Sequence, residues 1–188
     1  MRLADGALYQ TALAELGDVT ARITAAETAA ACALIADAGQ LVLYGCGREG
    51  LLVRGFAMRL HHLGLRVAMQ GDMACPPVGP GDLFIASAGP GELSTVTALM
   101  QVARGAGADV LFLTAEPATP TARLATQVLT IPAQTMARDT APGASTVLPM
   151  GSIYEGALFV LFEIMVLRLR ERLGATPEAM RARHTNLE

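Results

Sequence analysis

Short apolar runs alternate with helix-like segments from Gly39 to Ile131, and this alternation constrains the fold more than any other feature of the chain. Each apolar run is closed by a glycine-rich or polar turn, which is typical of a buried strand. Because helical segments separate the runs, as in βαβ units, the sequence predicts an α/β fold around a parallel sheet. The expected strands are residues 41–44, 66–69, 83–86, 110–113 and 128–131, and the expected helices are residues 51–63, 93–106 and 119–125.

The N-terminal region is expected to be helical. Apolar residues recur at steps of three and four over residues 3–36, with polar residues between them. This spacing predicts one long amphipathic helix with a break near Gly17.

The C-terminal region contains a strongly apolar helix. After a loop rich in Thr, Ala, Pro and Ser, a helix begins at Ser152 and is apolar on nearly every face as far as Leu167. Such a helix has to be buried, and in so short a chain we expect another subunit to bury part of it. A last short helix has Thr176 as its cap and Pro177 at its first position. We expect a single domain. Its parts are an N-terminal helical segment (residues 1–38), the sheet core (39–132), a loop (133–149), and the C-terminal helices and tail (150–188).

Composition excludes several classes of function. The formal charge of −3 gives no basic surplus for nucleic acid or an anionic membrane surface, and all 14 basic residues are Arg. Without Lys there is neither a Schiff base nor a Walker A loop. Residues 156–167 are too short for a membrane span, and the first residues lack the apolar segment of a secretory signal. The spacing of the three cysteines fits neither a zinc site nor a disulfide framework, so we expect a cytoplasmic protein without a metal.

Two glycine-rich loops follow predicted strands and precede helices. The first, Gly45-Cys-Gly-Arg-Glu-Gly50, is a literal G-x-G-x-x-G, and Asp72 near the end of the second strand completes a dinucleotide-binding pattern. A nicotinamide-dependent oxidoreductase that uses Gly45, Gly47, Gly50 and Asp72 is therefore one hypothesis. The second loop, Ala88-Gly-Pro-Gly-Glu92, favours another, because two such loops at strand ends form a small-molecule pocket. A third possibility is that these glycines only turn the chain.

Several motifs resemble the 6-phospho-3-hexuloisomerases of the sugar isomerase (SIS) domain superfamily. The likeness runs from about Gly39 to the last residue and implies a flavodoxin-like three-layer sandwich with a five-stranded parallel sheet, commonly assembled as a homotetramer. It also implies conversion of a 3-ketohexose 6-phosphate into fructose 6-phosphate without cofactor or metal. The motifs that carry it are Leu41-Val-Leu-Tyr-Gly-Cys-Gly-Arg48, Gly55-Phe-Ala-Met-Arg-Leu60, His62-Leu-Gly64, Gly81-Asp-Leu83, Pro149-Met-Gly-Ser152 and Arg183-His-Thr-Asn-Leu-Glu188.

The resemblance places proton transfer on Glu155 and His184. Moving a carbonyl along a sugar chain requires a base that takes a proton from the adjacent carbon, and a second group that moves the hydroxyl proton. Glu155 lies one turn into an apolar helix, where burial favours its neutral form and raises its pKa. A first-turn carboxylate that only offsets the helix dipole is the alternative. His184 lies in a polar tail, so it can act only if the terminus folds over a pocket, its own or a neighbouring subunit's.

The glycine loops depart from the family pattern at the phosphate site. The family's first loop reads Gly-Arg-Ser-Gly, and this chain has Glu49 in place of the serine. The family's second loop reads Ser-Gly-Ser-Gly-Glu-Thr, and this chain has Ala88, Pro90 and Leu93 in place of the three hydroxyl residues. Four hydroxyls are lost, Pro90 lacks an N–H, and a carboxylate is added, all of which oppose a dianionic ligand. We expect Glu49 to occupy the anion position at its own helix N-terminus. The expected sugar-binding residues are Gly45, Gly47, Arg48, Glu49, Ser87, Gly89, Gly91, Glu92, Ser94 and Thr95.

Two functions of the same fold remain open. The first is a sugar or sugar phosphate isomerase that forms a homo-oligomer, with a tetramer favoured over a dimer. The second is a module that binds or senses a sugar derivative without converting it. Activity on hexulose phosphates would separate them.

Overall fold

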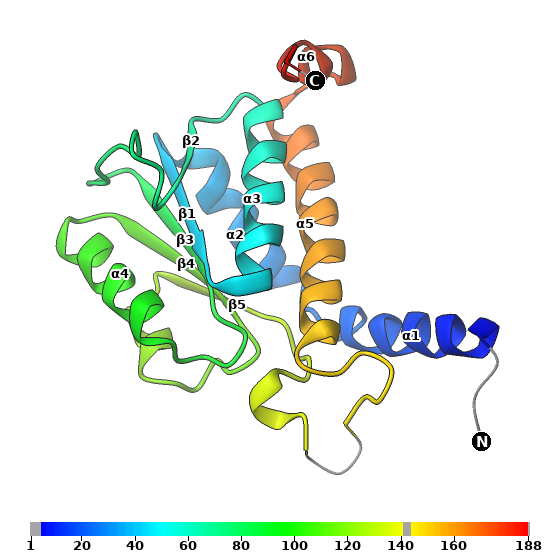
Figure 1. Cartoon of the computed structure of the whole chain (residues 1–188). Helices are drawn as coiled ribbons and strands as arrows, with labels where there is room; N and C mark the ends of the chain where they lie inside the picture. The colour runs from blue at the N-terminus through cyan, green and yellow to red at the C-terminus, as the bar shows by residue number, and fades with distance from the viewer. Residues whose placement is uncertain (1–4, 141–143, 188) are drawn as a thin grey trace.

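A five-stranded parallel sheet forms the centre of the molecule (Figure 1). The structure is a computed structural model that describes residues 5–140 and 144–187. The strand order is β2-β1-β3-β4-β5, and every neighbouring pair is parallel. The predicted α/β fold is therefore confirmed. The strands are β1 (Leu41–Gly45), β2 (Val67–Met69), β3 (Leu83–Ser87), β4 (Asp109–Thr114) and β5 (Gln127–Thr130).

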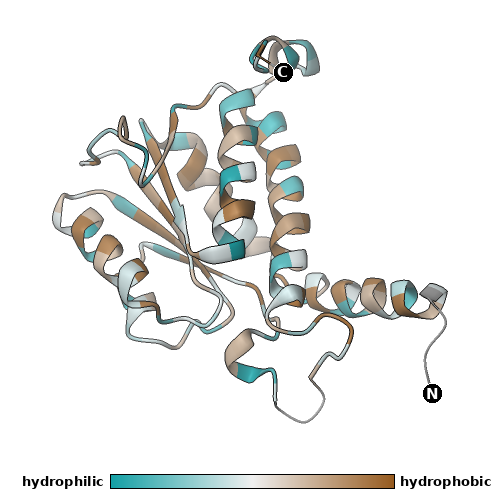
Figure 2. Ribbon diagram, viewed as in Figure 1, coloured by the Kyte–Doolittle hydropathy of each residue, from teal (hydrophilic) through white to brown (hydrophobic). Residues whose placement is uncertain are grey.

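Helices cover both faces of this sheet, because the central strands are apolar on both sides. Leu41 and Leu43 of β1 face a core formed with α2 (Ala25–Asp37), α3 (Gly47–His62) and α5 (Ser152–Leu173). Val42 faces the other core, which contains α4 (Ser94–Gly105) and the 3-10 helix η1 (Thr121–Leu124). Figure 2 shows the strands as mostly hydrophobic ribbons between these helical layers.

The N-terminal region forms two helices. A break was predicted, but its predicted position near Gly17 is wrong. Helix α1 (Asp5–Thr20) passes through Gly17 without interruption and meets α2 at 76° after a short break. Thr24 sets this boundary, because its side chain accepts a hydrogen bond from the N–H of Glu27 at 3.2 Å and caps α2. Cap chemistry therefore decides the break rather than glycine.

The C-terminal helix α5 extends beyond its apolar part. It continues through the arginines after Leu167 to Leu173 and packs along α3, where the rings of Phe56 and Phe162 stack with centroids 4.1 Å apart. The short helix α6 (Pro177–Ala182) follows, with the predicted cap at Thr176. Its capping hydrogen bond confirms that prediction.

Smaller elements also differ from expectation. The segment predicted as a helix over residues 119–125 is the shorter 3-10 helix η1, and the loop before α5 contains a second one, η2 (Met136–Arg138). The three cysteines are free. Within the described residues, no single helix is long and apolar enough to cross a membrane; only α1 and α2 taken together across their bend reach that length and composition.

Candidate active site

The two glycine loops and the start of α5 meet at the carboxyl edge of the sheet. Strand β1 lies between β2 and β3: the chain passes from β1 to β2 on one side, and then returns past β1 to β3 on the other side. This is the topological switch point at which parallel sheets bind ligands. The first loop is tightly packed, because a Cβ on Gly50 would lie 3.1 Å from the carbonyl carbon of Gly45 and closer still to its oxygen. Arg48 and Glu49 are thereby fixed in the first turn of α3.

Arg48 holds Glu155 at this edge. The Nε of Arg48 lies 3.1 Å from the Oε2 of Glu155, whose side chain is 18% exposed. The same guanidinium donates to Ser152 Oγ at 3.2 Å and to the carbonyl oxygen of Met150 at 2.6 Å. Burial raises the pKa of Glu155, and the charge of Arg48 opposes this rise. Glu155 is thus a carboxylate with a raised pKa and an anchored position, as a general base requires.

The turn before α5 supports this arrangement. Met150 and Gly151 have φ values of 54° and 81°, a left-handed conformation that is uncommon for a residue with a side chain. The turn lets the Met150 carbonyl point at Arg48 while Ser152 begins the helix. Only the family resemblance had pointed to this motif.

Glu49 reaches across to the second loop, contrary to the expectation that it would occupy the N-terminus of its own helix. Its carboxylate accepts hydrogen bonds from Ser87 Oγ at 2.6 Å and from the N–H of Gly89 at 3.0 and 3.1 Å. Burial raises the pKa of Glu49, the bonds from Ser87 and Gly89 lower it, and the charge of Glu155 raises it further. The physical reason is that a neighbouring loop presents a hydroxyl and an N–H in one place.

Tyr154 is a site residue that sequence analysis missed. It is 1% exposed, and its hydroxyl lies 3.4 Å from Ser87 Oγ, beside the group that holds Glu49. Burial raises the pKa of Tyr154 well above its ordinary value, so its phenol is neutral. Its place directly before Glu155 was the available signal, but an aromatic residue in an apolar helix is usually only part of the core.

The rest of the second loop faces elsewhere. Gly91 has a φ of 84° and packs against Glu116 and Thr119, which explains why glycine is needed there. Glu92 and Ser94 line a separate groove of about 480 Å³ between α4 and η1, and Thr95 is exposed. The structure therefore brings Ser87 and Gly89 to Glu49, but it does not bring Glu92 or Ser94 to Glu155.

His184 lies at the opposite end of the molecule from Glu155. Its ring is 5.2 Å from that of His62, at the C-terminal end of α3, and Arg183 donates to the carbonyl oxygen of His62 at 3.0 Å. Arg48 and Glu155 are at the other end of the 16-residue α3, which is about 24 Å long. Figure 1 shows α6 and the C-terminus at this far end of α3 and α5. One subunit does not bring the two predicted catalytic residues together.

The described residues form neither a close acidic contact for a dinucleotide nor a cluster for a metal ion. Asp72, the acidic residue of the dinucleotide pattern, pairs loosely with Arg54 at 4.0 Å, and both side chains are more than half exposed. Among the described side chains, no group of three or more His, Cys, Asp or Glu residues is placed to hold a metal ion. The described part of the site therefore consists of carboxylates, one guanidinium, hydroxyls and backbone N–H groups.

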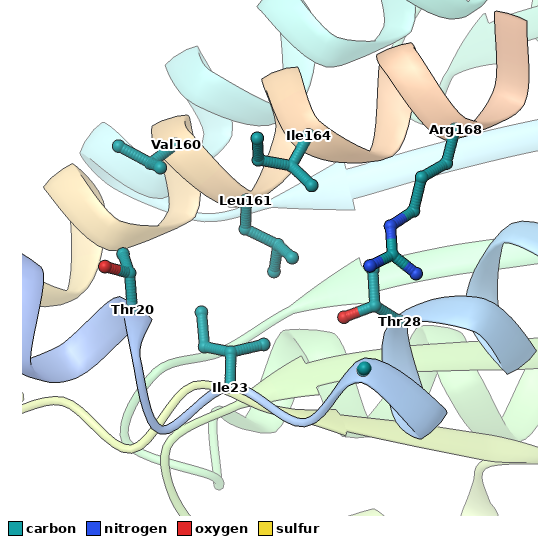
Figure 3. Close-up of a pocket in the computed structure, with 8 residues that line it drawn as sticks. Thr20, Ile23, Thr28, Val160, Leu161, Ile164 and Arg168 are labelled. Atoms are coloured by element: carbon teal, nitrogen blue, oxygen red, sulfur yellow. The ribbon is translucent and has the colours of Figure 1, made fainter.

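A small groove along α5 is separate from this site (Figure 3). It has a volume of about 190 Å³ and lies between α5 and the connection from α1 to α2. Ile23, Leu161 and Ile164 give it an apolar lining, and Arg168 closes one end. It contains neither Glu155 nor a residue of the glycine loops.

Comparison with known proteins identifies the family. The SIS domain family model matches residues 34–160. The chain is 35% identical over 175 residues to the 3-hexulose-6-phosphate isomerase of Mycobacterium gastri, covering 93% of this chain and 86% of the relative. It is 36% identical over 156 residues to the same enzyme of Methylomonas aminofaciens, covering 82% of this chain and 84% of the relative. A solved Methanococcus jannaschii structure, described as inferring a 3-hexulose-6-phosphate isomerase function, has a TM-score of 0.82 at 21% identity, covering 99% and 100%. From the fold, the two glycine loops and these matches, the chain belongs to the SIS domain family.

Proposed function

We propose that this protein is a sugar isomerase of the 3-hexulose-6-phosphate isomerase type, in which Glu155 is the general base. The observation that carries the proposal is the position of Glu155 at the switch point of the sheet, where burial raises its pKa and Arg48 anchors it. The curated relatives with that activity, at 35% and 36% identity, support the same reaction class. They also favour catalysis over the alternative of a sensing module.

The reaction requires a proton to move between adjacent carbons of a ketose. Glu155 removes the proton from the carbon beside the carbonyl, which leaves an enediolate, and returns it to the neighbouring carbon. One carbon is reduced as its neighbour is oxidised, so the reaction is redox-neutral and needs no cofactor. Arg48 lies close enough to Glu155 to oppose the rise in its pKa and to attract the oxygen on which negative charge develops.

His184 is proposed as the carrier of the hydroxyl proton, acting on the site of a neighbouring subunit. Its position at the far end of α3 separates it from Glu155 of its own chain. A homo-oligomer, with a tetramer favoured, would therefore complete each site from two chains. The ligand that this assembly binds is a small-molecule sugar or sugar phosphate.

Glu155→Gln tests the assignment of the base. The amide keeps the shape of the side chain but cannot accept the proton, so we expect kcat for 3-ketohexose isomerisation, free or phosphorylated, to fall by about 10²–10⁴. Glu163→Gln is the matched control, because Glu163 lies on the same helix, pairs with Arg59 at 3.4 Å and is outside the site. Activity of Glu155→Gln within a few-fold of the control would rule Glu155 out as the base. Sugar binding by the native protein without turnover would favour the sensing module.

Mixed oligomers test the shared site. Glu155→Gln and His184→Asn subunits, each expected to lose activity alone, should regain activity when refolded together, because some sites then receive an intact Glu155 and an intact His184. Recovery is expected in proportion to the fraction of mixed interfaces. No recovery, with mixed assembly shown by mass spectrometry, would contradict a site built from two chains.

A further inference from the structure

The Glu49 carboxylate occupies the hydrogen-bonding groups that the second glycine loop would otherwise offer to a ligand. Ser87 Oγ and the N–H of Gly89 both donate to it. A hydroxyl and a backbone N–H that converge on a negative oxygen form the kind of cradle that binds an anion. Glu49 and Tyr154 also crowd Gly89, since a Cβ there would lie 3.1 Å from the Oε1 of Glu49 and from the Tyr154 ring. The protein's own carboxylate thus fills the cradle.

The other N–H groups at the start of this loop are also engaged. Ala88 donates to the carbonyl oxygen of Leu113 at 3.0 Å, and Gly91 donates to that of Ala88 at 2.9 Å. Pro90 has no N–H. Residues 88–91 therefore offer no backbone donor to an incoming phosphate while Glu49 remains in place.

The charges at the site oppose an added anion as well. In the described part of the site there are two carboxylates, Glu49 and Glu155, and one guanidinium, that of Arg48, which is already paired with Glu155 and bonded to Ser152. Arg138, on the loop after β5, is paired with Glu116 at 2.6 Å. A dianion entering beside Glu49 would meet a site of net negative charge. Arg48 and Arg138 are both already paired, so neither would neutralise it.

We infer that Glu49 makes this site selective for a ketose that carries no phosphate, with a sugar hydroxyl donating to the carboxylate where related sites would hold a phosphate. The inference rests on the proposed isomerase function and names its substrate class. A neutral hydroxyl suits the place because an ionised carboxylate accepts about four hydrogen bonds, and among the described residues Ser87 and Gly89 are the donors to it.

The test compares free and phosphorylated sugars with the native protein and two variants. Glu49→Gln removes the charge and keeps the shape, and Glu49→Ser with Pro90→Ser restores hydroxyls and an N–H. Calorimetry with fructose 6-phosphate should show binding at least about tenfold tighter in both variants than in the native protein. Fructose should show no such gain. Glu163→Gln, which removes one negative charge outside the site, controls for net charge.

Turnover provides the second arm. The native protein should isomerise a free 3-ketohexose with a higher kcat/KM than its 6-phosphate. A higher kcat/KM for the phosphate, or no gain in fructose 6-phosphate affinity in Glu49→Gln, whose folding is checked by thermal unfolding, would overturn the inference. If neither sugar is turned over, the isomerase proposal fails, whereas the calorimetric comparison still decides whether Glu49 excludes phosphate.

Discussion

Gly50→Ala tests whether the close approach of α3 to β1 holds the site together. A Cβ at this position would lie 3.1 Å from the carbonyl carbon of Gly45 and closer still to its oxygen. Both are backbone atoms, so relief requires the first turn of α3 to move away from the strand. Inserting a carbon into packed structure costs about 1–3 kcal/mol, and a backbone clash belongs at the upper end of that range. The higher helix propensity of Ala returns roughly 1 kcal/mol at most.

Gly55→Ala is the matched control on the same helix. Gly55 is exposed, and nothing lies within 4 Å of its added Cβ, so only the propensity term remains. We expect Gly55→Ala to stabilise the protein by about 0.5–1 kcal/mol. Gly50→Ala should destabilise the protein by about 2 kcal/mol, the clash cost less the gain in helix propensity. This lowers Tm by roughly 4–8 °C in a chain of this size.

The assay is urea and thermal unfolding followed by circular dichroism at one fixed protomer concentration, because oligomerisation would otherwise alter Tm. Activity should fall as well, since the displaced turn carries Arg48 and Glu49. A Gly50→Ala protein as stable as Gly55→Ala would refute the reasoning. It would mean that the loop relaxes at no cost and that the glycine spacing does not fix the site.

Two further predictions concern the site and the surface. Arg48→Met should move the acidic limb of the kcat/KM profile to higher pH, because burial raises the pKa of Glu155, the Arg48 guanidinium opposes that rise, and the base acts only when deprotonated. An unmoved limb would contradict this. The outer face of α5 exposes Phe159, Ile164 and Leu167, whose exposed fractions are 55%, 43% and 47%. Ile164→Glu should therefore dissociate the expected oligomer, as measured by light scattering. A native protein that is already a monomer would contradict the assembly.

The sequence by itself determined the elements of the sheet and the position of its ligand-binding edge. Apolar runs and the glycine turns that end them are local features, and they place β1 to β5 within a few residues of their observed bounds. Glu155 was predicted from the family resemblance, with support from its place in an apolar helix, and its catalytic role stays a prediction. These signals are encoded in adjacent residues, so no tertiary contact is needed to detect them.

Tertiary structure alone decided which groups face one another. Ser87 and Gly89 are 38 and 40 residues from Glu49 along the chain, and only the parallel pairing of β1 with β3 brings their loops together. The separation of His184 from Glu155 likewise follows from the lengths and directions of α3 and α5. Side-chain periodicity records burial, but it contains no information about which loop meets another in space. The fold therefore decided that the added carboxylate fills a cradle on the second loop instead of capping its own helix.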